Sequence, residues 1–481
     1  MKLYSQNRHY KLYHGSMLDM LEVIEPCSID SIVTDPPYEL NFMGKGWDNS
    51  GIAFQKETWE NCYKALKSGG YLLAFGGSRT FHRIACAIED AGFEIRDTIM
   101  WLYGSGFPKS MDISKSIEAK LLTGSANTQE FKNLDGLKQK TGDWGISRNV
   151  LEQGARPSDY TADEHLRTVQ VDYKTEEALK WRGWGTALKP SYEPVIVARK
   201  PCIGSCTENV LKYGVGALNI DECRVGSEEH SVNINDFSNQ YGNKWGNGEP
   251  IGKLGEKTVV GRFPANTILT YNDEDFDEVC GGLPITKSNG GKVSMPDFTN
   301  IGEMSKENIG SSKLSFGQIT EVAKRKETGY VAPCDSGSAS RYFYCAKASK
   351  RDRDEGLNEF ESTDSGTYKF RQDGDFGEVP QKKNIHPTVK PTDLMQYLVR
   401  LVTPNGGTVL DPFNGSGSTG KAVMYENKDR NKGYKYIGIE LTADYLPIAK
   451  ARIEYVTKSE KEAEEVVKEE EIGKQMTIFD Y

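Results

Sequence analysis

Apolar and polar positions alternate along the first hundred residues in the rhythm of strands followed by helices. Two short apolar runs, Ser28–Thr34 and Tyr71–Phe75, end at turn residues and predict buried strands. Residues 81–91 have helical spacing, and a third apolar run follows at 94–102. Alternation of this kind favours a parallel sheet covered by helices on both faces.

The same rhythm returns near the C-terminal end, after a long irregular middle. Strands are predicted at 408–411 and 434–440, and helices at 393–402, 417–425 and 443–456. The middle is rich in Gly, Asn and Ser and predicts long loops, apart from an apolar strand near 193–199 that can join the core. Two half-sheets separated by an insertion predict one discontinuous α/β domain.

Composition and charge restrict the classes of protein that fit these patterns. In 481 residues, no apolar run approaches the roughly 18 residues of a membrane span, so we expect a cytoplasmic protein. Nine Cys without a dense framework fit reduced thiols, and we expect no metal site, because the pair Cys202 and Cys206 has no second pair. The net charge of −9 argues against a nucleic-acid partner, but residues 341–353 are locally basic.

A Gly-rich turn follows the strand at 408–411. The segment VLDPFNGSGSTG places Gly415 and Gly417 before a helix whose first N–H groups are free. A second strand then ends at Glu440, where a carboxylate can bind the two hydroxyls of a ribose. The turn has neither a Walker lysine nor the pattern G-x-G-x-x-G, which favours a nucleoside cofactor without phosphates.

A second motif, Asp35-Pro36-Pro37-Tyr38, follows the strand at 28–34. Two prolines cannot continue a central strand. The Asp35 carboxylate and the Pro36 carbonyl are therefore left as two hydrogen-bond acceptors beside a flat ring. Two acceptors match the two hydrogens of an exocyclic amino group, and an ordinary Asp-Pro turn is the alternative interpretation.

Together with HPTVKP at 386–391, these motifs resemble those of the β-group amino-directed DNA methyltransferases, which modify N6 of adenine or N4 of cytosine. Further segments are similar to those of phage-borne and orphan members: 101–110, 185–201, 214–224, 261–266 and 340–356. The resemblance implies a Rossmann-like α/β fold with a mostly parallel, doubly wound sheet. The sheet is expected to be permuted, because the Asp-Pro-Pro-Tyr motif precedes the Gly-rich motif.

The resemblance also implies roles for single residues. The target amino group and the extruded base would be bound by Asp35, Pro36, Pro37 and Tyr38. The cofactor S-adenosyl-L-methionine (AdoMet) would be bound by Asp411, Phe413, Gly415, Gly417, Glu440 and Lys390. This chain departs from its relatives before the first motif, where they carry Gly-Asp and it has Gly15-Ser16; Asp19 either compensates or faces solvent.

A catalytic domain is expected to combine residues 1–110 and 384–457, with a target-recognition region at 111–383 and a charged tail at 458–481. Four basic residues either contact DNA phosphates or lie on a solvated turn: Lys347, Lys350, Arg351 and Arg353. The segment Gln475–Phe479 resembles peptides that bind bacterial sliding clamps, and docking on its own domain is the alternative. A homodimer is left open.

The expected function is site-specific methyl transfer from AdoMet to the amino group of a flipped base in double-stranded DNA. Asp before Pro-Pro-Tyr is more typical of members that modify N6 of adenine. N4 of cytosine and a catalytically impaired DNA-binding relative are the alternatives. Methylation of RNA or of protein glutamine is disfavoured by the large insertion and by HPTVKP.

Overall fold

The structure, a computed structural model, describes residues 1–40, 46–103, 110–126, 175–235, 253–271, 285–288, 292–296, 325–331, 335–338, 344–347, 350–364 and 381–457. The chain divides into two compact units. The larger unit holds residues 1–223, 266–270 and 346–481, and the smaller unit holds 224–265 and 271–345. None of the helices in the described ranges has the length and apolar character that a bilayer crossing requires.

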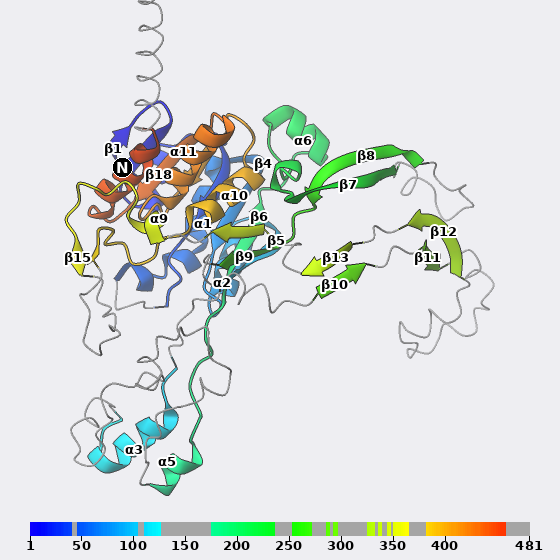
Figure 1. Ribbon diagram of the computed structural model, residues 1–481. Coiled ribbons are helices and arrows are strands. Elements are labelled where there is room, and N and C mark those ends of the chain that lie inside the picture. Colours follow the sequence, from blue (N-terminus) through cyan, green and yellow to red (C-terminus); the bar gives the residue numbers. More distant parts are fainter. Residues whose placement is uncertain are drawn as a thin grey trace, which may run out of the picture. The chain divides into compact units, whose positions relative to one another are not determined.

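A ten-stranded sheet runs through the larger unit in the order β1-β2-β18-β17-β3-β4-β6-β5-β9-β14 (Figure 1). The strands are β1 Lys2–Gln6, β2 Tyr10–His14, β3 Ile29–Thr34, β4 Leu66–Phe75, β5 Glu94–Tyr103, β6 Tyr192–Arg199, β9 Thr267–Tyr271, β14 Tyr344–Lys347, β17 Thr408–Asp411 and β18 Lys435–Glu440. From β2 to β9, neighbouring strands are parallel, except that β6 is antiparallel to both β4 and β5. The predicted mostly parallel α/β sheet is confirmed.

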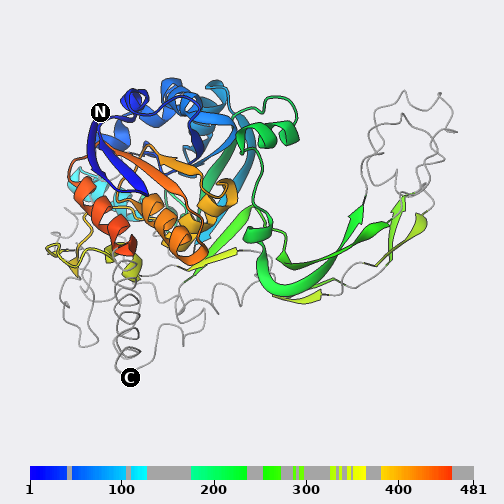
Figure 2. The ribbon, with the colours of Figure 1, turned by 90° about the horizontal axis from the view of Figure 1, so that it is seen from above.

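Helices cover both faces of this sheet, as Figure 2 shows. On one face, α1 (Lys56–Ala65) and α2 (Phe81–Asp90) share an apolar core with the 3-10 helix Met17–Glu22 and with β3 and β4. On the other face, α10 (Thr392–Val402) packs on α11 (Ser418–Arg430). The other helices named here are α3 Ile113–Thr123, α5 Glu176–Lys180, α6 Cys206–Tyr213 and α9 Lys350–Asp354.

The two α/β stretches of the sequence meet at the pairing of β3 with β17. Val409 pairs with Ser31, and Leu410 pairs with Ile32, in parallel. Parallel neighbours end at the same edge of a sheet, and therefore the turns that follow β3 and β17 lie side by side. Ligands of open α/β sheets bind at this carboxyl edge.

The apolar strand expected near 193–199 is β6, which lies inside the sheet. Its antiparallel direction places its first residues, Tyr192 and Glu193, at the edge where β3 and β4 end. The pairing of Phe75 with Val195 and a hydrogen bond from Gly76 N to Pro194 O, 3.0 Å long, fix this register.

The smaller unit contains antiparallel strand pairs within a stretch whose weak periodicity predicts long loops. These pairs are β7 Val225–Asn235 with β8 Lys253–Arg262, β10 Ile285–Ser288 with β13 Asp335–Ser338, and β11 Lys292–Pro296 with β12 Arg325–Val331. In the larger unit, β15 Thr363–Asp364 pairs with β16 Gln381–Lys382. A two-stranded ribbon is held by backbone hydrogen bonds, and so its sequence needs no alternation of apolar residues.

An ion pair buried between α10 and α11 allows a test of this packing. Arg400 donates to both carboxylate oxygens of Glu426 at 2.6 and 3.0 Å, and the two residues are 6% and 0% exposed. Glu426→Ala removes the carboxylate that pairs with this buried guanidinium, and we expect it to lower the free energy of unfolding by about 3–5 kcal/mol. Urea unfolding followed by circular dichroism measures the change.

The matched control is the double variant Arg400→Met/Glu426→Leu, which removes both charges and keeps the volume. It should recover most of the lost stability. A double variant as unstable as Glu426→Ala would contradict this explanation.

Candidate active site

A cavity of about 1630 Å³ lies at the carboxyl edge of the parallel strands. Its walls come from both α/β stretches: Asp35 and Tyr38 follow β3, Phe413 follows β17, and Glu440 ends β18. Pockets for one small ligand usually measure roughly 300–1,000 Å³. The cavity therefore has room for two occupants side by side.

Most of the site residues expected from the sequence line this cavity. They are Asp35, Pro36, Pro37, Tyr38, Lys390, Asp411, Phe413, Gly415, Glu440 and Arg353. Gly417 lies behind the wall as the N-cap of α11, with φ +76° and only 3.0 Å from an added Cβ to Ala449. The side chains of Lys347, Lys350 and Arg351, and the segment Gln475–Phe479, lie outside the described part of the chain.

The Asp-Pro-Pro-Tyr turn is held by a buried carboxylate that the sequence analysis missed. Asp48, 2% exposed, accepts the backbone N–H groups of Tyr38 and Glu39 at 2.9 and 3.0 Å. Thr80 donates to the Tyr38 carbonyl at 2.8 Å. These bonds fix the turn before any ligand enters, and an Asp in a polar stretch gives no sequence signal of such a role.

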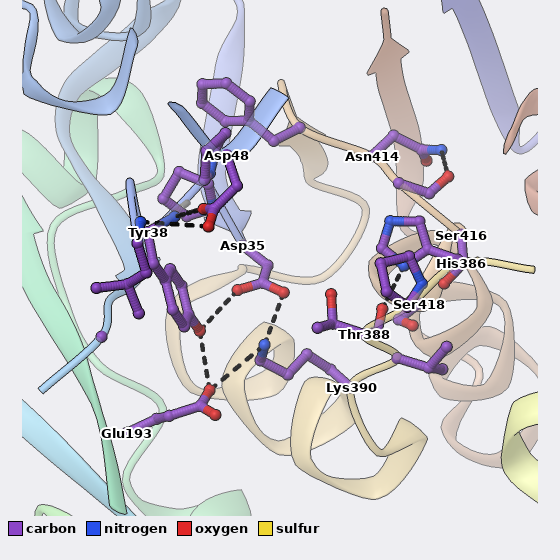
Figure 3. Close-up of a pocket in the computed structure, with 18 of the residues that line it drawn as sticks. Asp35, Tyr38, Asp48, Glu193, His386, Thr388, Lys390, Asn414, Ser416 and Ser418 are labelled. Atoms are coloured by element: carbon purple, nitrogen blue, oxygen red, sulfur yellow. Dashed lines mark hydrogen bonds and ion pairs between the residues drawn. The ribbon is translucent and has the colours of Figure 1, made fainter. Parts of the chain in front are cut away.

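Four side chains form one charged group at this end of the cavity, as Figure 3 shows: Asp35, Tyr38, Glu193 and Lys390. The Tyr38 hydroxyl lies 2.9 Å from Asp35 Oδ1 and 2.8 Å from Glu193 Oε2. Lys390 Nζ lies 2.6 Å from Asp35 Oδ2 and 3.4 Å from Glu193 Oε2. We call these four residues the Tyr38 cluster. Glu193 was missed because the direction of β6 cannot be read from its sequence.

The cluster gives Lys390 a protein partner. Its ammonium contacts the carboxylate of Asp35, and the contact with the cofactor that the resemblance implies stays a prediction. Lys390 is 7% exposed. Burial alone would lower the pKa of its ammonium, but the carboxylates of Asp35 and Glu193 outweigh burial and raise it. Lys390 therefore stays charged.

The Gly-rich turn forms the other end of the cavity, on the far side of Asp35 in Figure 3. Glu440, 8% exposed, accepts the N–H groups of Gly415 and Thr442, each at 2.7 Å. Burial raises the pKa of the Glu440 carboxyl. A carboxylate has about four acceptor sites, and so Glu440 can bind the turn and still accept hydroxyl groups.

His386 packs directly against this turn. A Cβ added to Gly415, whose φ is +50°, would lie 2.9 Å from His386 Nε2. The His386 ring also meets the ring of Tyr445 edge to face, with centroids 4.6 Å apart. Burial lowers the pKa of His386 to about 4, so that the ring is neutral at pH 7. The wall here is aromatic and uncharged.

The segment 352–355 packs beneath the cavity. Lys421, 0% exposed, lies 2.7 Å from Asp352 and 2.8 Å from Glu355. Arg353 lines the cavity and donates to the His386 carbonyl at 2.6 Å. Residues 352–355 thus contact the rest of the larger unit through their own charges, although their sequence is compatible with a solvated turn or with contacts to phosphates.

Ser16 and Asp19 differ in their relation to the cavity. Ser16 lines the cavity, and its Oγ accepts the N–H of Leu18 at 3.2 Å as the N-cap of the first 3-10 helix. Asp19 is exposed and is not among the lining residues. Asp19 therefore does not replace the acidic residue that relatives carry at position 16.

These residues fit AdoMet, the cofactor that the resemblance implies. At the Gly-rich end, the walls supply a carboxylate, backbone amides, and the aromatic rings of Phe413 and Tyr445. The absence of a side chain at Gly415 leaves space against His386. Carboxylate and rings suit the ribose and the adenine of a nucleoside.

Comparisons with known proteins agree with this chemistry. The model of an N6/N4 Mtase family, described as DNA methylase, matches residues 29–451. The Type II methyltransferase M.HpaI of Haemophilus parainfluenzae is 25% identical over 250 residues, which cover 47% of this chain and 76% of that protein. The DNA adenine methyltransferase YhdJ of Escherichia coli (strain K12) is 35% identical over 83 residues, 17% of this chain and 26% of that protein.

Among solved structures, the PvuII DNA methyltransferase (cytosine-N4-specific) aligns with a TM-score of 0.38 at 13% identity, covering 95% of this chain and 93% of that chain.

Asp411 gives a test of the junction between the two ends of the cavity. It is 2% exposed, accepts from Thr34 and Thr419 at 2.6 and 2.7 Å, and has a pKa that burial raises from 3.8 to about 6. The folded protein therefore keeps a proton that the unfolded chain loses near pH 4, and stability falls as the pH rises from about 4 to about 6. The contribution is about 3 kcal/mol.

In Asp411→Asn this contribution is absent. The stability difference between wild type and this variant should be about 2 kcal/mol more in favour of the wild type at pH 4 than at pH 7, as urea unfolding at both pH values measures. A stability difference between the two proteins that is the same at both pH values would contradict the raised pKa.

Proposed function

Because the chain belongs to the N6/N4 DNA methylase family, whose match spans residues 29–451, it methylates DNA with AdoMet as its cofactor, and we propose that its target is N6 of adenine in double-stranded DNA. One observation carries the proposal. The acceptors of the Asp-Pro-Pro-Tyr turn and the carboxylate of Glu440 line one cavity that is large enough for two ligands.

The residues of the turn act on the amino group of the target base. An exocyclic amine is a weak nucleophile because its lone pair is conjugated with the ring. Hydrogen bonds from the amine to the Asp35 carboxylate and the Pro36 carbonyl favour a pyramidal nitrogen with a free lone pair. Bound AdoMet supplies a methyl group activated by a positively charged sulfur. Positioning is then the main contribution of the protein.

The amino group lies inside the stacked duplex, so the base must leave the stack to reach Asp35. The ring of Tyr38 stands beside the acceptors and offers a face for stacking. Glu440 and the amides of the Gly-rich turn hold the nucleoside part of the cofactor at the other end. The methyl group of the cofactor then lies between its nucleoside part and the target base.

Adenine is favoured over cytosine by two facts. Asp, not Ser, precedes the Pro-Pro-Tyr sequence in this chain. The E. coli relative that is named a DNA adenine methyltransferase shares 35% identity over its matched segment. N4 of cytosine is the alternative. Four further expectations stay predictions: target recognition by residues 111–383, phosphate contacts by Lys347, Lys350 and Arg351, clamp binding by Gln475–Phe479, and a homodimer.

Incubation of duplex DNA with the purified protein and labelled AdoMet, followed by nuclease digestion and mass spectrometry, tests the target. We expect N6-methyldeoxyadenosine. Asp35→Asn should lower the transfer rate by about 10²–10³-fold, because it removes the charged acceptor of the amine. Its affinity for AdoMet, measured by calorimetry, should stay within about twofold of wild type. Detection of N4-methyldeoxycytidine would contradict adenine as the target, and DNA that stays unmethylated would contradict the methyltransferase activity itself.

The cofactor end is tested by Gly415→Ala. The added Cβ would lie 2.9 Å from His386 Nε2 at a φ of +50°, and the turn must shift. We expect AdoMet affinity to fall at least about tenfold in calorimetry, since 1.4 kcal/mol of strain gives that factor. Gly406→Ala is the matched control, with φ +74° and no described atom within 4 Å of the new Cβ. Equal losses in both variants would contradict a contact with His386.

A further inference from the structure

The hydroxyl of Tyr38 lies within hydrogen-bond distance of two carboxylates at once. Its oxygen is 2.9 Å from Asp35 Oδ1 and 2.8 Å from Glu193 Oε2 (Figure 3). A hydroxyl carries one proton and can donate to only one of these oxygens at a time. With both carboxylates ionised, the other contact joins two oxygens with no proton between them. The Tyr38 cluster therefore has a place for one additional proton.

The charges of the Tyr38 cluster are consistent with a place for one additional proton. The single ammonium of Lys390 offsets only one of the two carboxylates of the cluster, those of Asp35 and Glu193. Tyr103 also faces Glu193, donating to Oε1 at 3.4 Å. The carboxyl of Asp411 and the ring of His386, which is uncharged at pH 7, lie near Asp35. Burial raises the pKa of Tyr38 well above its ordinary value, so the hydroxyl is neutral.

Methylation of an amino group creates a proton that must leave. When the nitrogen lone pair forms the new N–C bond, the electron pair of the broken S–C bond goes to sulfur, and the nitrogen becomes positively charged. The uncharged methylated amine forms only when this nitrogen loses one of its protons. Asp35 is the acceptor in contact with that amine.

We propose that Glu193 receives this proton from Asp35 through the hydroxyl of Tyr38. The inference rests on the proposed function, because it needs an amine bound at Asp35. The Asp35 carboxylate takes the proton from nitrogen and passes it from Oδ1 to the Tyr38 oxygen, while Tyr38 gives its own proton to Glu193 Oε2. Asp35 is again ionised, Tyr38 is again neutral, and Glu193 is protonated. No other reactant takes part.

Lys390 sets the direction of this transfer. Its ammonium lies 2.6 Å from Asp35 Oδ2 and 3.4 Å from Glu193 Oε2. At equal effective dielectric, the attraction at the shorter distance is about a third stronger. A proton that moves from Asp35 to Glu193 therefore leaves the stronger ion pair, that of Lys390 with Asp35, intact. In this scheme Glu193 acts through Tyr38 and is a positioning and proton-accepting residue.

Two conservative variants test the relay in the full-length protein. Glu193→Gln keeps the size of the side chain and removes the proton acceptor, and Tyr38→Phe keeps the ring and removes the hydroxyl. The single-turnover rate of methyl transfer to duplex DNA is measured between pH 6 and pH 9. Glu89→Gln, at an exposed position on α2, is the matched control. Calorimetry measures AdoMet affinity in every variant.

We expect each variant to lose about tenfold to hundredfold in rate at pH 7, in the range of lost acid–base catalysis. The loss should shrink as the pH rises, and added imidazole should restore part of the rate, because solvent bases then take the proton. The double variant should be no slower than the slower single variant, since both residues serve one path. Glu89→Gln and all AdoMet affinities should match wild type.

A loss that is the same at every pH, or multiplied losses in the double variant, would show a merely structural role and overturn the relay. Rates equal to wild type in both single variants would overturn it as well. If Glu193→Gln does not fold, the pH profile of Tyr38→Phe decides alone. Failure of the proposed function is separate: in that case the wild type itself transfers no methyl group to DNA.

Discussion

The parallel pairing of β3 with β17 is the constraint on which the whole site depends. Two strands that are far apart in the sequence run in register, and Thr34 at the end of β3 donates to Asp411 at the end of β17 at 2.6 Å. Because the strands end together, the turns that follow them open into one cavity. A methyl donor and an amino group bound at these turns must therefore meet, since neither turn can move without disrupting the buried sheet.

Buried charges beneath the Gly-rich turn add rigidity where the sheet ends. Arg452, 0% exposed, donates to the Ser416 carbonyl at 2.6 Å and to its Oγ at 2.9 Å. Burial of a charged group costs free energy that its hydrogen bonds offset only in part, and so Arg452 does not serve stability alone. Their bonds fix the carbonyls of the turn, which lets its amides and Glu440 face the ligand without reorganisation. Preorganisation of this kind is what catalysis by positioning requires.

The sequence predicted the sheet and both turns because their signals are local. Apolar runs that end at prolines or glycines mark where a strand stops, whatever the rest of the chain does. It could not predict Asp48 or Glu193, whose roles arise from contacts across the fold. Lys390 shows the same limit, because its motif is readable but its partner is 355 positions away in the sequence. The charges of segment 352–355 are compatible in sequence with solvent or phosphate contacts. In the structure, Asp352 and Glu355 instead pair with the buried Lys421.

In the proposed reaction, charge links the two ends of the cavity. The donor sulfur begins positive and the amine neutral, and positive charge moves to the nitrogen as the methyl group is transferred. That movement brings the charge toward Asp35 and Glu193, which outnumber Lys390 within the Tyr38 cluster. The attraction is therefore greater in the transition state than in the ground state, the condition under which an interaction accelerates a reaction. The same excess of carboxylates thus favours both the transfer of the methyl group and the loss of the proton that follows.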